Sequence, residues 1–472
     1  MLFNTAAFAV FLVVVVGLTW AIEASGMQNC WRVRLRRGLL LLASYWFYAC
    51  WDPRFLGLIV GVTLLDWLAA LALARLRHRG LRLYMVAVTV GLNLGLLGFW
   101  KYTDFFLRVL APLYEALGRD PLAPLGLVLP VGISFFTFQG LSYVIDVYRG
   151  DVEVERSPTR FALFIAFFPQ LVAGPIMRAS QLLPQLDRPG QVDATRFGQA
   201  VALMIVGLLK KVVMADYLAA NLVDRVFDLP ERFSSVEVLV GVYGYALQIY
   251  GDFSGYCDMA IGAALLLGIQ LPINFDAPYR AASLREFWRR WHITLSQWLR
   301  DYLYISLGGS RGGRWRTYRN LFLTMLLGGL WHGAAYDFVI WGAFHGAGLA
   351  AERILRRNTG VKLPPWLGVL ATFHVVCALW VFFRAETFAG ALRVFAQLGE
   401  GVWGVSNLTP NVVALVVVGF IGHFLPDRWW ERGLRAFVRA PVALQAAAAV
   451  ATLHLAQKAA ESGAAPFIYF QF

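Results

Sequence analysis

Charged residues are scarce in this 472-residue chain. They make up 15% of it and hydrophobic residues 59%, whereas an ordinary soluble domain carries about 25% charged residues. A soluble protein of this length could not cover its surface with so few charges, which excludes a soluble fold. Regular alternation of apolar and polar residues, which marks membrane-spanning strands, is absent as well. The composition therefore predicts an all-α integral membrane protein.

Cysteines and acidic residues are also few. The four cysteines stand alone, without a CxxC pair or a histidine at metal-ligand spacing, so we expect neither a disulfide framework nor a metal site. Only 29 acidic residues stand against 42 basic ones, giving a net charge of +13. The basic residues form short bursts between apolar blocks, as in cytoplasmic loops, which indicates an anionic leaflet of the lipid bilayer and not nucleic acid as the partner. The bursts are Arg32–Arg37, Arg75–Arg82, Lys210–Lys211, Arg311–Arg319, Arg353–Arg357 and Arg428–Arg439.

The apolar residues form long charge-poor blocks, several of which approach the roughly 20 residues that a membrane-spanning helix needs. They include Met1–Ile22, Gly38–Ala49, Phe55–Ala74, Leu83–Trp100 and Val412–Leu425. We expect about twelve crossings in a single membrane domain, 1–472, since the chain has no Gly/Ser linker and no clear repeat. The first block has no basic residue before it, which favours an uncleaved anchor with its N-terminus outside and the basic bursts inside.

Two segments are interrupted by proline and glycine. Pro124, Pro130, Gly132 and Gly140 break the run 124–148, and Pro169, Gly174 and Pro175 break the run 161–184. Such breaks occur at membrane depth only where protein or a water-filled cavity surrounds the backbone. We therefore expect re-entrant or broken helices in both segments.

The segment Ser283–Tyr304 is amphipathic when it is drawn as one helix. An apolar stripe of Trp288, Trp291, Leu295, Trp298 and Tyr302 adjoins a polar face that contains Arg289, and His292 lies at their border. This pattern predicts an interfacial helix with its tryptophans anchored at the headgroups. It leaves open whether His292 is structural or functional.

His332 follows Arg319 by thirteen residues, roughly 20 Å along a helix. If Arg319 lies at the cytoplasmic interface, His332 lies past the middle of the apolar core, where an ionisable group indicates a functional site by default. Trp331 would form an apolar wall, and Gly328, Gly329 and Gly333 would leave room for backbone or substrate. The alternative is a histidine held by a bond between helices. His345 fits either interpretation.

Two carboxylates, Asp252 and Asp258, lie within the apolar region around YGDFSGYCDMAIG, Tyr250–Gly262. Buried carboxylates pair with cations or line an aqueous cavity. We expect Arg289 or Arg285 to be the partner, and structural pairing and support of a site remain equally open.

The long motifs RRWHITLSQWLRDYLYISLGGSRGG and LLGGLWHGAAYDFVIWGAFHG resemble those of the membrane-bound O-acyltransferase (MBOAT) family. With FFPQLVAGPIMR and YGDFSGYCDMAIG, they are most similar to its bacterial branch for alginate O-acetylation. The resemblance covers nearly the whole chain. It implies that His332 stands at the family's membrane histidine and His292 at its second polar site residue.

This resemblance implies an O-acetyltransferase of the bacterial inner membrane. The expected donor is cytoplasmic acetyl-CoA, with no permanently bound cofactor, and the acceptor is an extracytoplasmic polysaccharide. Alginate is the first candidate acceptor, followed by peptidoglycan, cellulose or another exopolysaccharide. D-alanyl transfer to teichoic acid is a more distant alternative. A neutral imidazole is the usual general base near pH 7, so His332 would remove the acceptor's proton. His292 would orient the substrate or the thioester carbonyl. A covalent acyl-histidine is the less favoured variant.

The chain ends in AAPFIYFQF, residues 464–472, after an apolar run that predicts a helix over about 441–459. Aromatic residues can simply anchor at the outer interface. The ending F-x-Y-x-x-F also resembles an acyl-transfer motif of this branch, which implies that Tyr469 accepts the acetyl group and passes it to a periplasmic SGNH-type transferase. Two other classes stay open, a transporter and a non-catalytic scaffold for an exopolysaccharide complex. A transporter predicts inverted repeats, which the sequence lacks.

Overall fold

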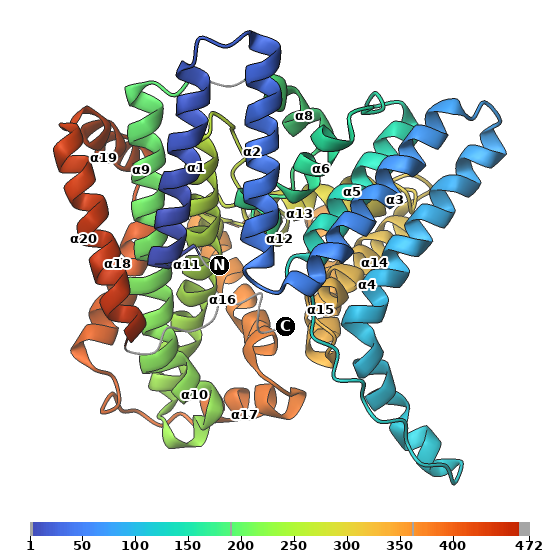
Figure 1. Ribbon diagram of the computed structural model, residues 1–472. Coiled ribbons are helices and arrows are strands. Elements are labelled where there is room, and N and C mark those ends of the chain that lie inside the picture. The colour runs from blue at the N-terminus through green and yellow to red at the C-terminus, as the bar shows by residue number, and fades with distance from the viewer. Residues whose placement is uncertain (1–2, 189–190, 361–362, 462–472) are drawn as a thin grey trace. The chain divides into compact units, whose positions relative to one another are not determined.

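The computed structural model describes residues 3–188, 191–360 and 363–461 (Figure 1). Within these ranges the chain is helical and contains no strand, which confirms the all-α prediction. The chain divides into two compact units: Met1–Phe197 with Ala260–Pro272, and Gly198–Met259 with Ile273–Phe472. The expectation of a single membrane domain stays a prediction.

The first unit consists of the early apolar blocks. Its helices are α1 (Ala6–Ala24), α2 (Asn29–Ala49), η1 (Pro53–Phe55), α3 (Leu56–Arg75), α4 (Arg79–Ala116), α5 (Ile133–Arg149), α6 (Pro158–Ala166), α7 (Phe168–Leu171) and α8 (Ala179–Asp187). The Arg36 guanidinium and the Trp20 indole donate to the carbonyls of Leu267 and Leu266 at 2.7 and 2.9 Å. The first two helices are thus bonded to the segment Ala260–Pro272.

The interrupted segments of this unit agree with prediction in part. Residues 161–184 are broken into α6, α7 and α8, as expected. In 124–148 the break lies before Gly132, whose φ of +72° begins α5. Gly140 does not break the helix: a Cβ there would meet Asp66 Oδ2 at 1.8 Å, so Gly140 admits the buried Asp66 of α3. Because Gly140 has no side chain, α5 can pack closely against α3 at this point.

The second unit begins within a long helical stretch and ends at the C-terminal helix. It contains most of α9 (Ala194–Leu208), then η2 (Leu209–Asp216), η3 (Ala219–Val223), α10 (Asp224–Asp228), η4 (Pro230–Arg232), most of α11 (Ser235–Leu266), η5 (Pro278–Arg280), α12 (Leu284–Arg290), α13 (Ile293–Trp298), η6 (Leu299–Tyr304), α14 (Arg314–His332), α15 (Tyr336–Thr359), α16 (Pro365–Arg384), α17 (Phe388–Gly399), α18 (Pro410–Phe424), α19 (Asp427–Arg439) and α20 (Val442–Glu461). The last agrees with the helix expected over about 441–459.

Glycines let α14 and α15 pack closely. A Cβ on Gly329 would lie 2.2 Å from the Phe338 carbonyl oxygen, and one on Gly342 would lie 2.4 Å from that of Met325. A Cβ on Gly333 would strike the Phe338 ring at 2.1 Å. The space at Gly329 and Gly333 is therefore filled by the neighbouring helix α15, so of the two expected uses of these glycines, approach of backbone or of substrate, the structure shows close helix packing.

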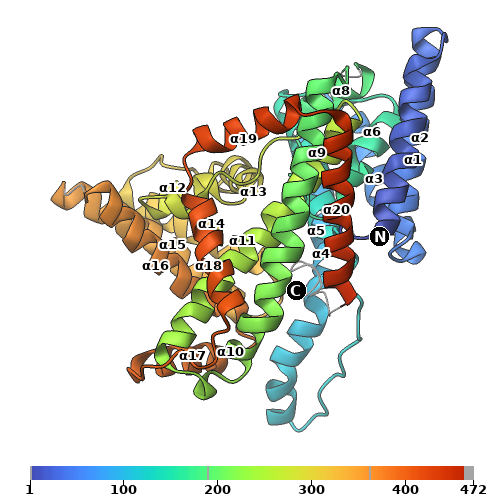
Figure 2. The same cartoon turned by 90° about the vertical axis from the view of Figure 1, so that its left-hand side faces the viewer.

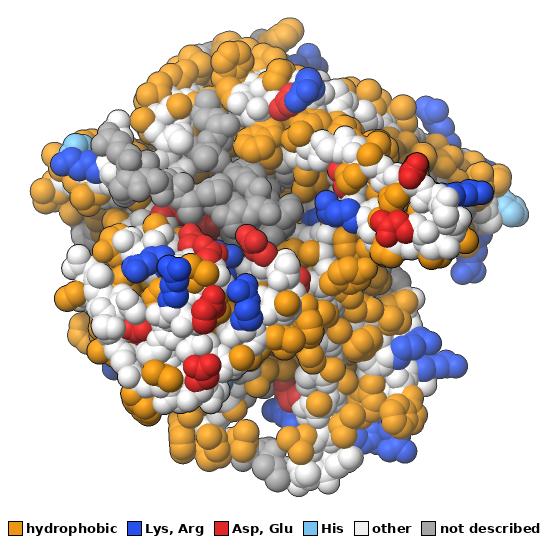
Figure 3. All heavy atoms as spheres, turned by 90° about the horizontal axis from the view of Figure 1, so that it is seen from below, with side chains coloured by type: hydrophobic (Ala, Val, Ile, Leu, Met, Phe, Trp, Pro, Cys, Tyr) orange, Lys and Arg blue, Asp and Glu red, His pale blue; other side chains and the backbone are white. Residues whose placement is uncertain are grey.

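Four helical segments among the described residues are long and apolar enough to cross a membrane: Ala6–Ala24, Pro53–Arg75, Arg79–Ala116 and Pro365–Arg384. The bent pair Pro410–Phe424 and Asp427–Arg439 raises this number to five if it forms one span. The expected count of about twelve crossings is not confirmed. Hydrophobic side chains occupy much of the face in Figure 3, and Lys, Arg, Asp and Glu gather in separate clusters, as suits a protein with lipid as part of its solvent.

Candidate active site

His292 lies in a break between two short helices. The residues around it do not form the single interfacial helix that the sequence pattern suggests, because α12 ends at Arg290 and α13 begins at Ile293. His292 adopts φ +42°, in the left-handed region, and its side chain is fully buried. The tryptophans of the expected interfacial stripe, Trp288, Trp291 and Trp298, are buried as well. The interfacial assignment is therefore wrong, since this stripe forms part of the protein core.

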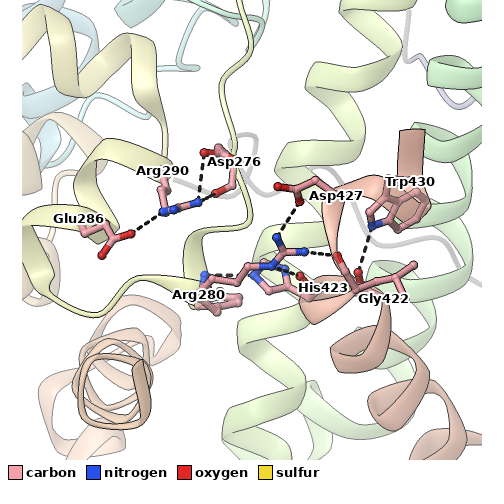
Figure 4. Close-up of polar contacts among 10 residues, drawn as sticks. Asp276, Arg280, Glu286, Arg290, Gly422, His423, Asp427 and Trp430 are labelled. Carbon is pink, nitrogen blue, oxygen red and sulfur yellow. Dashed lines mark hydrogen bonds and ion pairs between the residues drawn. The ribbon is translucent and has the colours of Figure 1, made fainter. Parts of the chain in front are cut away.

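Both ends of α12 are fixed by polar contacts. At its start the Ser283 hydroxyl accepts from the Glu286 backbone N–H at 3.1 Å, and the Glu286 carboxylate accepts from the Ala282 N–H at 3.0 Å. At its end the Arg290 guanidinium donates to Glu286 at 3.0 Å and to the Asp276 carboxylate at 3.1 Å (Figure 4). These bonds hold the backbone two residues before His292.

Asn274 orients the His292 ring. Its side-chain oxygen accepts from the Thr294 backbone N–H at 3.1 Å and lies 3.3 Å from His292 Nδ1. Because this oxygen can only accept, Nδ1 carries the proton and the Nε2 of a neutral ring carries the lone pair. Burial lowers the pKa of His292 to about 3, so the ring stays neutral at physiological pH. Its Nε2 can therefore accept a hydrogen bond but cannot donate one.

His332 is the last residue of α14 and is 4% exposed. Its ring lies against Trp341 and Phe383, with ring centroids 5.2 and 5.4 Å away. Trp331 connects the two histidines: its ring centroid lies 5.0 Å from that of His332 and 6.1 Å from that of His292. The structure thus places His292 and His332, two predicted site residues, next to the buried indole of Trp331, which was predicted as well.

His345 belongs to the same aromatic cluster. Its Nδ1 accepts from the Trp288 indole N–H at 3.3 Å, and its ring centroid is 4.6 Å from that of Trp341. This bond from Trp288 places the proton of a neutral His345 on Nε2. His345 thus supports the aromatic wall that His332 also contacts.

Asp252 and Asp258 have different partners from those expected. Lys211 Nζ lies 2.8 Å from Asp252 and 2.7 Å from Asp216, and Lys210 Nζ lies 2.7 Å from Asp258. The predicted pairing with Arg289 or Arg285 is wrong because the lysines on η2 face this part of α11. These ion pairs join two helices at a π-helical stretch, a feature that often marks functional sites.

Arg289 instead lines a basic cavity of about 820 Å³. Its wall contains six arginines and one carboxylate: Arg285, Arg289, Arg300, Arg353, Arg356, Arg357 and Glu352. Arg300 pairs with Asp301 and Arg356 with Glu352, at 2.7 and 3.6 Å, which leaves a large excess of positive charge. Thr324 and Met325 of α14 also line this cavity. Met325 precedes His332 by seven residues, roughly 10 Å along the helix.

Sequence reasoning missed Asn274, and it wrongly grouped Lys210 and Lys211 with the basic bursts of cytoplasmic loops, whereas both lie in the helix η2 and are paired with carboxylates. Asn274 lies in a non-helical segment eighteen residues before His292, and no local pattern links the two. The adjacent lysines inside an apolar helix were a usable signal, since buried cations there need carboxylate partners. Among the described residues no group of His, Cys, Asp and Glu side chains could hold a metal ion. Tyr469 lies outside the described residues.

Comparison with known proteins agrees with these features. The model of the membrane-bound O-acyltransferase family matches residues 154–389, which include His292 and His332. The probable alginate O-acetylase AlgI of Pseudomonas aeruginosa is 43% identical over 423 residues, 89% of this chain and 80% of that protein. The Pseudomonas putida AlgI is 41% identical over 93% of this chain and 95% of its own length. A peptidoglycan O-acetyltransferase of Helicobacter pylori is 39% identical over 78% of this chain and 74% of its own length.

These similarities and the helical membrane architecture agree with the motifs from which the family was predicted. The chain is a multi-pass membrane acyltransferase and belongs to the membrane-bound O-acyltransferase family.

Proposed function

We propose that this enzyme works in the bacterial inner membrane and transfers an acetyl group from cytoplasmic acetyl-CoA to an acceptor, for O-acetylation of an extracytoplasmic polysaccharide. Alginate is the first candidate for that polysaccharide. The observation that carries the proposal is the pair of buried histidines on Trp331, at the end of the helix whose earlier turns line the arginine cavity. The similarity to the alginate O-acetylases favours alginate.

His332 acts as the general base in this proposal. Its imidazole takes the proton of the acceptor hydroxyl as the oxygen attacks the thioester carbonyl carbon. The carbon–sulfur bond then breaks, and the imidazolium returns the proton to the leaving thiolate. Base catalysis of this kind contributes roughly 10²–10⁴-fold to a rate. No covalent bond to the histidine is required.

His292 orients the acceptor hydroxyl. Its neutral Nε2 can accept a hydrogen bond from that hydroxyl, because Nδ1 is directed at Asn274. A thioester carbonyl would need a donor, which this tautomer does not offer. The geometry thus favours the hydroxyl over the thioester carbonyl, the other substrate group weighed for His292.

The arginine cavity receives the nucleotide phosphates of the donor. Arg353 and Arg357 are basic side chains of α15 that line the cavity, and guanidinium groups bind phosphate through paired, charge-assisted hydrogen bonds. The acyl-bearing arm would then extend along α14 toward His332. CoA is a substrate here, and no cofactor needs to stay bound.

The identity of the polysaccharide that receives the acetyl group can be tested with membrane vesicles that contain this protein and its polysaccharide machinery. Radiolabelled acetyl-CoA is supplied on the cytoplasmic side, and label is measured in alginate, peptidoglycan and cellulose. We expect label in alginate. The peptidoglycan O-acetyltransferase relative makes peptidoglycan the second candidate. Label in peptidoglycan alone would replace alginate as the acceptor, and no label in any polymer would contradict O-acetylation.

Tyr469 serves as an acetyl relay to a periplasmic SGNH-type transferase in this proposal, on the basis of the F-x-Y-x-x-F ending. A phenyl ester is more activated than an alkyl ester, so onward transfer to a sugar is downhill. Mass spectrometry of the C-terminal peptide, from cells without the periplasmic partner, should show acetyl on Tyr469. Tyr469→Phe keeps the aromatic ring and removes the hydroxyl, and full polymer acetylation by this variant would rule the relay out.

A further inference from the structure

The short helix α19 is set crosswise to the helix that precedes it. α18 and α19 are bent by 96° at the turn between them, and Figure 2 shows α19 lying across the direction of α18 and α20. α18 carries no Asp, Glu, Lys or Arg and is suited to the membrane interior. If α18 crosses the membrane, a helix at a right angle to it lies along the membrane surface.

The two faces of α19 differ sharply in chemistry. At 100° per residue, Arg428, Arg432, Arg435 and Arg439 fall on one narrow face, and Trp429, Trp430 and Leu434 lie elsewhere around the helix. None of its residues is buried, and the two tryptophans are 51% and 48% exposed. A helix of this kind buries its apolar face at the headgroup boundary and keeps its basic face among the headgroups.

α19 is bonded to the protein at both ends. The Arg280 guanidinium donates to the His423 carbonyl at 2.9 Å, to the Asp427 carboxylate at 2.7 Å and to the Leu425 carbonyl (Figure 4). At the other end the Gln445 amide donates to the carbonyls of Phe437 and Ala440 at 3.1 and 3.0 Å. The orientation of the helix is therefore fixed, although its middle packs against little protein.

The arginines of α19 lack an acidic partner among the described side chains. No described acidic side chain forms an ion pair with any of the four, and the one carboxylate at the start of α19, Asp427, is bonded to Arg280. Glu431 is the only other acidic residue of the helix. The face thus keeps a net positive charge, complementary to anionic phosphates.

We propose that α19 lies in the membrane surface and that its row of arginines binds the phosphates of anionic phospholipid headgroups. The bent turn sets the helix in the surface plane, the exposed tryptophans enter the headgroup boundary, and the four guanidinium groups face the phosphates. The helix then attaches the second unit to an anionic leaflet, independently of which polymer is acetylated.

Native mass spectrometry of the detergent-solubilised full chain, titrated with phosphatidylglycerol or phosphatidylcholine, tests this binding. We expect tighter binding of phosphatidylglycerol. Arg432→Gln combined with Arg435→Gln should weaken it by roughly tenfold or more, since each basic residue near an anionic surface contributes several-fold. Glu431→Gln should strengthen it. Phosphatidylcholine binding should change little in either variant.

A charge-matched control is the exposed pair Arg119 and Arg393, which lies outside α19 and outside the basic bursts. Arg119→Gln combined with Arg393→Gln removes the same charge and should weaken phosphatidylglycerol binding much less. Equal loss in both double variants would show that net charge alone attracts the lipid. That result, or equal binding of the two lipids by the wild type, would overturn the proposal. Preference for an alginate oligomer over phosphatidylglycerol would overturn it as well.

Discussion

His292 holds a backbone conformation that few side chains adopt. Its φ of +42° lies in the left-handed region, which costs an ordinary residue roughly 1–2 kcal/mol. Asparagine tolerates this region because its short polar side chain bonds locally. The position thus demands both a backbone conformation and a polar group.

We therefore expect two His292 variants to differ in how much activity and stability they lose. His292→Ala should lower the acetyl-transfer rate by at least about tenfold and also lower the thermal stability, through lost hydrogen bonds and backbone strain. His292→Asn should lose less of both, because it keeps a polar group and tolerates the conformation. Initial rates and unfolding temperatures in detergent measure the two effects. Equal losses in both variants would contradict the role given to His292.

At the residue scale, the sequence identifies the two histidines and Trp331 but not what orients them. An ionisable residue in an apolar run is visible locally, so His332 could be predicted. The contact of Asn274 with His292 depends on how a loop returns to the break between α12 and α13. The lysine partners of Asp252 and Asp258 depend likewise on which faces of η2 and α11 meet.

At the scale of elements, the apolar blocks predict helices well because membrane-spanning backbone must pair its own hydrogen bonds. α1, α3 and α18 follow the predicted blocks closely, whereas α4 extends from its predicted end at Trp100 to Ala116. The segment Ser283–Tyr304 could not be predicted in the same way. Its periodicity is helical throughout, and only tertiary packing reveals the break at His292 and the burial of the tryptophans.

We expect the arginines of α15 to contribute to recognition of the donor. Arg353→Gln combined with Arg357→Gln should raise the KM for acetyl-CoA by roughly tenfold or more, with little change in kcat, because charge-assisted bonds to phosphate are lost. Acetyl-pantetheine lacks the nucleotide phosphates, so its KM should be equal in variant and wild type. An unchanged KM for acetyl-CoA would remove the cavity from donor binding.

At the scale of the whole molecule, the number of crossings is the least predictable feature. Hydropathy recognises long uncharged helices, but several helices of the second unit are short, broken or charged. Their placement in the membrane depends on packing partners that a sequence window does not contain. The orientation of the first helices is easier to predict from the sequence, since it follows from the basic bursts.

Two natural cysteines test that orientation. Cys30 and Cys50 are exposed near opposite ends of α2, and the other two cysteines are buried. With the N-terminus outside and Arg32–Arg37 inside, Cys50 lies on the periplasmic side and Cys30 on the cytoplasmic side. A membrane-impermeant maleimide added to spheroplasts should label Cys30→Ser protein but not Cys50→Ser protein. The reverse pattern would invert the topology.

The most direct measurement of the central claim is the rate of acetyl transfer from radiolabelled acetyl-CoA by His332 variants in the intact membrane system. His332→Ala and His332→Gln should lose roughly 10²–10⁴-fold in rate while membrane insertion and unfolding temperature stay nearly unchanged. The exposed His78 supplies the control, and His78→Gln should match the wild type. A folded His332 variant that keeps more than about a tenth of the wild-type rate would contradict the assignment of His332 as the base.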